Sequence, residues 1–135
     1  MADLTAVTYI HLVEAVEQVR TYPAGEAITQ GQVVSFNSTG KVVKARATTG
    51  PILSKGIALT TAGAANLPVA VLRDGIVDVG NILGGLAFGA FAYASDTAGV
   101  LEDGSVNSLA AIGEVIPAWG ATTGDKLLRI KMGAR

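Results

Sequence analysis

The second half of the chain repeats the first half with a spacing that suits β-strands. GQVVSFNST at 31–39, followed by GKV, matches GAFAYASDT at 89–97, followed after one inserted residue by GVL. GIALT at 56–60 matches GEVIP at 113–117, and VLR at 71–73 matches LLR at 127–129. The offsets, 58, 57 and 56 residues (31 to 89, 56 to 113, 71 to 127), drift so little that two copies of one supersecondary unit are predicted. One such unit cannot cover its own apolar face, so the two must pack on each other.

The composition predicts an all-β fold. Half of the 135 residues are hydrophobic, only 5% are aromatic, and 17 are glycine, which favours short strands and frequent turns over a helix bundle. The turns bound expected strands at 32–36, 41–47, 52–60, 69–73, 76–79, 90–94, 112–116 and 126–132, with a tight turn at Asp74-Gly75. We expect a small barrel or sandwich in which each half (about 26–80 and 84–132) supplies roughly one sheet.

Residues 1–20 lie outside the repeat and fit two patterns. Tyr9, Leu12, Val13, Val16 and Val19 would line one face of a helix, whereas Val7, Tyr9, His11 and Val13 alternate as in a strand. We interpret 1–20 as an N-terminal arm or first element that leads into a single β domain at 21–135. Apart from this region, helix is expected only in a short turn near 84–88.

Charge and composition exclude several classes of function. The formal charge is −1, so no global field attracts nucleic acid or an anionic membrane, and the absence of cysteine rules out disulfides and thiolate metal sites. The first residues lack the pattern of a signal peptide, so we expect synthesis in the cytoplasm. The apolar stretch 79–94 is short and broken by glycines, so we expect no membrane partner. Acids dominate residues 1–40, and bases dominate the last ten residues, so these two ends could attract each other.

No constellation of catalytic, cofactor-binding or metal-binding residues stands out. His11 is the only histidine, and neither a P-loop nor a dinucleotide fingerprint is present. Asp74 and Asp78 are interpreted as turn and strand residues, not as an acid–base pair. Asp96, Glu102 and Asp103 lack the spacing of a calcium loop. We therefore expect no enzyme and no cofactor.

An ordered set of fragments resembles a known family. TYPAGEAITQGQVVSFNSTGKVVKA, GIALTTA, VLRDGIVDVG, GLAFGAFAYASDTAGVLED, IGEVIPAW and DKLLRI, which span about residues 20–132, resemble the decoration (cement) proteins of tailed-bacteriophage capsids. The resemblance implies a β-tulip or β-barrel type of domain. It also implies a structural virion protein on the outer surface of an expanded head, where it stabilises the capsid against the pressure of packaged DNA.

The resemblance also implies partners. One partner is the major capsid protein. The others are two further copies of the chain in a homotrimer, whose assembly could be limited to the capsid. N-terminal arms would reach the capsid or a neighbouring copy. The candidate contact residues are Val7, Tyr9, Ile10, Leu12, Val13 and Trp119, the last because a lone tryptophan often anchors an interface.

Two other functions stay open. A glycan-binding or fibre-type β module on a virion or cell surface would need Tyr22, Tyr93 and Trp119 to converge on one polar groove. An enzyme would have to work with turn carboxylates alone.

Overall fold

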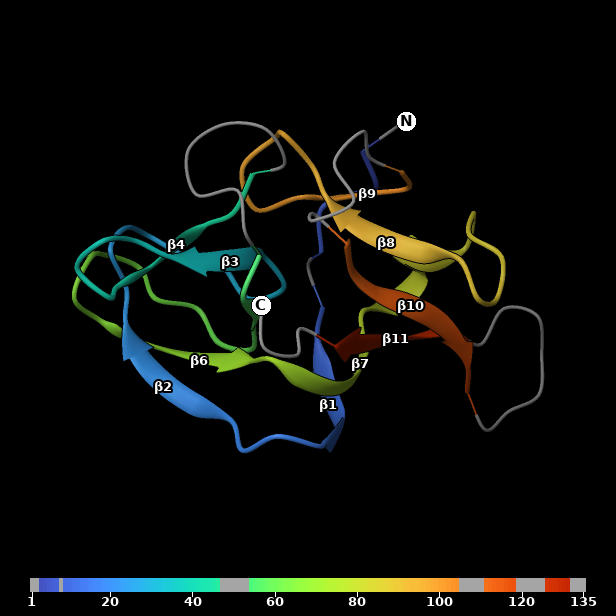
Figure 1. Cartoon of the computed structure of the whole chain (residues 1–135), viewed down its shortest axis with the longest axis horizontal. Coiled ribbons are helices and arrows are strands. Elements are labelled where there is room, and N and C mark those ends of the chain that lie inside the picture. The colour runs from blue at the N-terminus through green and yellow to red at the C-terminus, as the bar shows by residue number, and fades with distance from the viewer. Residues whose placement is uncertain (1–2, 8, 47–53, 105–110, 119–125, 132–135) are drawn as a thin grey trace.

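Two antiparallel β-sheets make up the computed structural model, which describes residues 3–7, 9–46, 54–104, 111–118 and 126–131. The predicted all-β class is confirmed. Within these residues the sheets form a small sandwich and do not close into a barrel (Figure 1). A short 3-10 helix, η1 (Gly80–Leu83), is the one helical element of the described part of the chain.

The sheets differ by one strand. The five-stranded sheet has the order β2 (Arg20–Pro23), β6 (Pro68–Leu72), β5 (Gly56–Ala58), β3 (Val33–Phe36) and β4 (Val42–Lys44). The six-stranded sheet has the order β1 (His11–Ala15), β7 (Asp74–Asp78), β11 (Lys126–Lys131), β10 (Ala111–Pro117), β8 (Phe91–Ala94) and β9 (Leu101–Glu102). Strands β7 to β11 therefore repeat the order of β2 to β6, and β1 is an additional strand at the edge of β7.

The register of the strands corrects one of the three offsets. Phe36 pairs with Val42 as Ala94 pairs with Leu101, in agreement with the sequence alignment of these segments. Ile57 pairs with Leu72, and its counterpart Glu114 pairs with Arg129. Leu72 therefore corresponds to Arg129, 57 residues later (72 to 129), and the offset of 56 at this strand was wrong.

The turns repeat as closely as the strands. Gly31 and Gly89 both have positive φ (87° and 84°), and their N–H groups donate to Ala58 and Val115 at the same distance, 2.7 Å. Gly31 and Gly89 thus start β3 and β8 in the same way, because glycine adopts this left-handed conformation at little cost.

Asp74-Gly75 does not form the predicted tight turn. Only Arg73 separates β6 from β7, and the chain passes there from the five-stranded sheet directly into the six-stranded sheet. A Cβ atom at Gly75 would lie 2.4 Å from the carbonyl oxygen of Glu14. The glycine therefore serves the close approach of β1 and β7, and an Asp-Gly pair indicated a turn where the chain instead changes sheet.

The five-stranded sheet is buried on both faces. Val33, Ile57 and Leu72 belong to the core shared with the six-stranded sheet. Their neighbours in sequence face a second core, which has the buried residues Ala24, Ile28, Val34, Val42, Ala58, Ala62, Val69 and Val71. Because side chains alternate along a strand, this double burial explains the nearly continuous apolar runs of the first half.

Candidate contact surfaces

The N-terminal segment lies against its own subunit. β1 pairs antiparallel with β7, so the strand pattern, not the helix pattern, describes residues 11–15. Val7, Ile10 and Leu12 are partly buried against the shared core. Tyr9 and Val13 are 51% and 42% exposed. The predicted contact residues thus divide into inward and outward groups, and Trp119 lies outside the described residues.

Asp3 anchors this segment to the second half. Its carboxylate accepts hydrogen bonds from the hydroxyl groups of Ser95 and Thr97, the latter at 2.8 Å. These two bonds lower the pKa of Asp3, because they stabilise the charged carboxylate. In the matching turn of the first half, Asn37 Oδ1 instead accepts from the backbone N–H and the hydroxyl of Thr39. In the second turn, Ser95 Oγ accepts from the backbone N–H of Thr97, and the acceptor for the hydroxyl groups comes from the start of the chain, which sequence reasoning missed.

The segment then crosses the start of β3. Leu4 N–H donates to the carbonyl of Leu101 at 2.8 Å. A Cβ atom at Gly31 would lie 2.3 Å from a methyl group of Val7. The repeated glycine in the first half therefore has a second role, since it makes room for the N-terminal segment.

One face of the six-stranded sheet is open. Cross-strand pairing aligns a row of residues from five strands on this face: Glu14, Ile76, Arg129, Glu114 and Phe91. Arg129 makes an ion pair with Asp74 at 2.9 Å, and Phe91 is 54% exposed. We call the part of this face around Phe91, Gly113, Glu114, Arg129 and Lys131 the open face.

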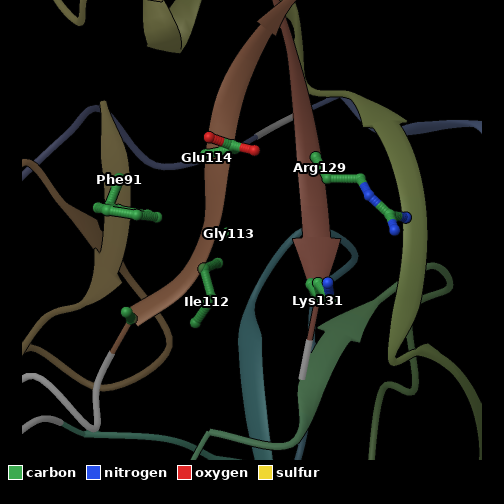
Figure 2. Close-up of a pocket in the computed structure, with 7 residues that line it drawn as sticks. Phe91, Ile112, Gly113, Glu114, Arg129 and Lys131 are labelled. Carbon is green, nitrogen blue, oxygen red and sulfur yellow. The ribbon is translucent and has the colours of Figure 1, made fainter. Parts of the chain in front are cut away.

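The open face contains a hollow of about 260 Å³. Figure 2 shows Phe91 and Glu114 on neighbouring strands and Arg129 and Lys131 on β11, with Gly113 on the strand between them. A Cβ atom at Gly113 would lie 2.0 Å from the carbonyl oxygen of Arg129, so only glycine allows β10 and β11 to approach this closely.

Comparison with the first half of the duplication shows that the exposure of the open face is unusual. The row in the first half that corresponds to Phe91, Glu114 and Arg129 is Val33, Ile57 and Leu72, and all three are fully buried. Sequence reasoning missed the open face because the offset of 56 aligned Arg73 with Arg129. With an offset of 58 for Val33 and of 57 for Ile57 and Leu72, three buried aliphatic positions change to an aromatic, an acid and a base. This contrast between the halves is the signal that would have found it.

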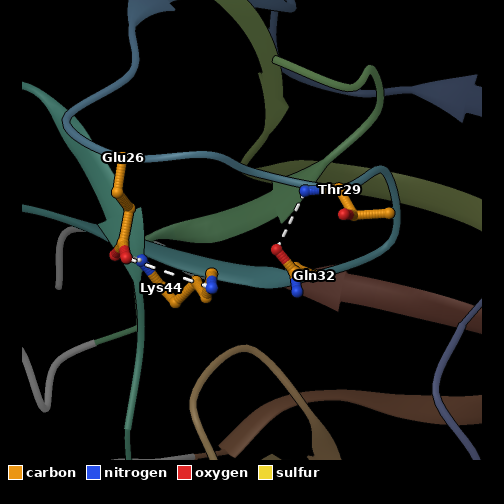
Figure 3. Close-up of polar contacts among 4 residues, drawn as sticks. All are labelled: Glu26, Thr29, Gln32 and Lys44. Carbon is orange, nitrogen blue, oxygen red and sulfur yellow. Dashed lines mark hydrogen bonds and ion pairs between the residues drawn. The ribbon is translucent and has the colours of Figure 1, made fainter. Parts of the chain in front are cut away.

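Other polar contacts secure a connection in the first half. Glu26 Oε2 accepts from the backbone N–H of Lys44 at 3.0 Å, and the Lys44 ammonium lies 4.0 Å from Glu26 Oε1 (Figure 3). Gln32 Oε1 accepts from the N–H of Thr29 at 2.9 Å. These bonds hold the segment that carries the buried Ile28, so we assign them to the fold and not to a binding site.

The titratable residues singled out in the sequence include two acids with hydrogen-bond partners in the fold and an exposed histidine. Asp78 accepts from the N–H of Gly80 at 2.9 Å, and Asp74 binds Arg129. His11 is exposed and lies opposite Asp78 in the register of β1 and β7. The described residues bring together no group of three or more side chains that could hold a metal ion. No helix in the described part of the chain has the length and hydropathy of a membrane span.

The aromatic residues of the glycan hypothesis belong to different sheets. Tyr22 on β2 packs edge-on against Phe36, with ring centroids 4.9 Å apart, whereas Tyr93 on β8 packs edge-on against Phe91, with centroids 6.5 Å apart. The third residue, Trp119, lies outside the described residues. The two tyrosines thus stabilise separate sheets through aromatic pairs.

The comparisons with known proteins give one match. A family model described as phage cement protein matches residues 7–74, half of the chain. The match begins in the N-terminal segment and covers β1 and the whole five-stranded sheet. No curated protein matches the chain.

Proposed function

Because the chain belongs to the phage cement protein family, which gives it a structural, capsid-associated role, we propose that it decorates the outer surface of the expanded phage head and stabilises the shell. The partner is the major capsid protein, and the assembling unit is a trimer. The protein is made in the host cytoplasm and acts in the virion. The family match over half of the chain is the observation that carries this proposal.

Binding of the protein stabilises the expanded shell through mass action. A protein that binds the expanded shell and not the unexpanded shell shifts the equilibrium towards the state that displays its site. When one assembly engages several shell subunits at once, modest affinity at each contact gives a high total affinity. The pressure of packaged DNA is then resisted by many copies, each of which contributes a small share.

The fold supports this role because it is a double scaffold with a shared core. A five-strand unit occurs twice, and the buried row Val33, Ile57 and Leu72 joins the two units. The N-terminal segment adds a sixth strand to one unit and leaves Tyr9 and Val13 exposed. Such a body can transmit load between neighbours, because close-packed interiors deform little.

The experiment mixes the purified protein with undecorated expanded heads and with procapsids, sediments both, and quantifies the bound copies. Saturable binding to expanded heads alone, in a fixed ratio to the major capsid protein, is expected. Equal binding to both shells would contradict the mass-action argument. Absence of binding to either shell would reject the decoration role. A glycan array would then test the alternative function, a glycan-binding β module.

A further inference from the structure

We propose that the open face is a docking surface for a second copy of this chain, which inserts the exposed residues of its N-terminal segment, Tyr9, Val13 and Val16. This inference rests on the trimer that the proposed function includes, and it assigns the two surfaces that meet. The described part of the chain exposes six large hydrophobic side chains, and four of them form these two groups: Tyr9, Val13 and Val16 on the N-terminal segment and Phe91 beside the hollow, with Leu67 and Phe88 apart.

The first argument is that the same face of the repeated unit is buried in the first half and exposed in the second half. In the first half, the six-stranded sheet buries the corresponding row completely. In the second half, the described part of the chain contains no further unit over this row, and Phe91 stands 54% exposed beside a hollow of about 260 Å³. An aromatic side chain next to a hollow is typical of the anchors of protein interfaces.

The second argument is chemical complementarity between the two groups. The hollow is lined by the ring of Phe91, an acid, Glu114, and a base, Lys131, and neither charge has an ion-pair partner among the described residues. The N-terminal segment presents the phenol of Tyr9, a donor that Glu114 can accept, and the acid Glu14, which can pair with Lys131. A ring from Tyr9 against Phe91 would also form an aromatic pair.

The third argument is that the free sheet edges are poorly suited to association. β1 is interrupted by a bulge between Leu12 and Glu14, and β2 ends at Pro23, which has no N–H to donate. Bulges and prolines are devices that prevent edge-to-edge pairing. Contact through a face is therefore favoured over addition of a strand.

Two different patches that bind each other form a heterologous interface. Such interfaces close into rings when the rotation between copies is suitable, so the pairing of the N-terminal segment with the open face accounts for a trimer without a second type of contact.

The test uses the absence of cysteine from the chain. A Tyr9→Cys protein is mixed with a Phe91→Cys protein under mild oxidation, both free in solution and on expanded heads, and the disulfide-linked dimers are quantified. The matched control replaces Phe91→Cys by Leu67→Cys, because Leu67 is 47% exposed but lies beside the five-stranded sheet. The Tyr9/Phe91 pair should give on the order of tenfold more mixed dimer than the control, because docked copies hold the two thiols at high effective concentration.

A second measurement uses Phe91→Ser and Leu67→Ser in sedimentation velocity and in head binding. Phe91→Ser should weaken association between copies, and Leu67→Ser should not. Mixed dimer no more abundant than the control, in solution and on heads, would overturn the inference. It would also be overturned if Phe91→Ser lost head binding without any cross-link to Tyr9, since the shell would then occupy the open face. Cross-linking in solution without head binding would support the inference and reject only the proposed function.

Discussion

Single residues tie together parts of the chain that are distant in sequence. Asp3 supplies the acceptor for the hydroxyl groups of Ser95 and Thr97, whereas in the first half the hydroxyl of Thr39 donates locally to Asn37. No sequence pattern marked this contact, because the two partners are about ninety residues apart and each is an ordinary polar residue. The glycines were visible as turn markers, but their second role, making room for a neighbouring strand, depends on the tertiary structure.

Replacing Asp3→Asn should lower the free energy of unfolding at neutral pH. The folded pKa of Asp3 is lowered by Ser95 and Thr97, so its contribution is present above the unfolded pKa and disappears as the pH falls through the folded pKa. The difference between wild type and variant should therefore shrink below about pH 4, near the ordinary pKa of aspartate. Denaturant unfolding at pH 7 and at pH 3 measures it, with the exposed Glu17→Gln as control. A difference that does not change with pH would contradict the role of the charge.

Replacing Gly113→Ala should destabilise the fold. The added Cβ would lie 2.0 Å from the carbonyl oxygen of Arg129, at the first pair of the register between β10 and β11. We expect a loss of about 1–3 kcal/mol or more, typical of overpacking at a site that cannot relax. Gly85→Ala is the matched control, since its Cβ would meet nothing within 4 Å. Equal thermal midpoints for the two variants would show that the strands can separate without cost.

At the level of elements, β1 is a strand of the six-stranded sheet and not a detached arm. The sequence placed residues 1–20 outside the repeat, and in the structure β1 pairs with the outer edge of β7. What the pattern could not decide was helix or strand, because both periods fit the same few apolar residues. The strand conformation is decided by β7, because residues 11–15 pair with its outer edge.

Removal of residues 2–16 should therefore cost stability as well as assembly. It removes the partly buried Leu4, Val7, Ile10 and Leu12 from the core. We expect the free energy of unfolding to fall by roughly 4 kcal/mol, at about 1 kcal/mol for each of the four partly buried aliphatic side chains. Denaturant unfolding followed by circular dichroism measures this loss. The double variant Tyr9→Ser, Val13→Ser, which alters only exposed side chains, should keep the wild-type stability; a comparable loss there would show that the outward group also supports the fold.

At the level of the whole molecule, the duplication was the part of the fold most readily predicted. Repeated apolar alternation and turn glycines were enough to indicate an all-β scaffold of two units, because these features are local. The passage from β6 into β7 was not, since an Asp-Gly pair between apolar runs usually indicates a hairpin. The open face was not predicted either, because it depends on which of two equivalent faces the partner unit covers.

The central claim is that the protein strengthens the expanded head, and the most direct test is the temperature at which DNA-filled heads release their genome. Heads that lack the protein are saturated with it, and DNA release is followed with a fluorescent dye during heating. The account predicts that release shifts to higher temperature in proportion to the number of bound copies, with a smaller shift for Phe91→Ser than for Leu67→Ser. An unchanged release temperature at full occupancy would contradict the claim, because the protein would then bind the shell without stabilising it.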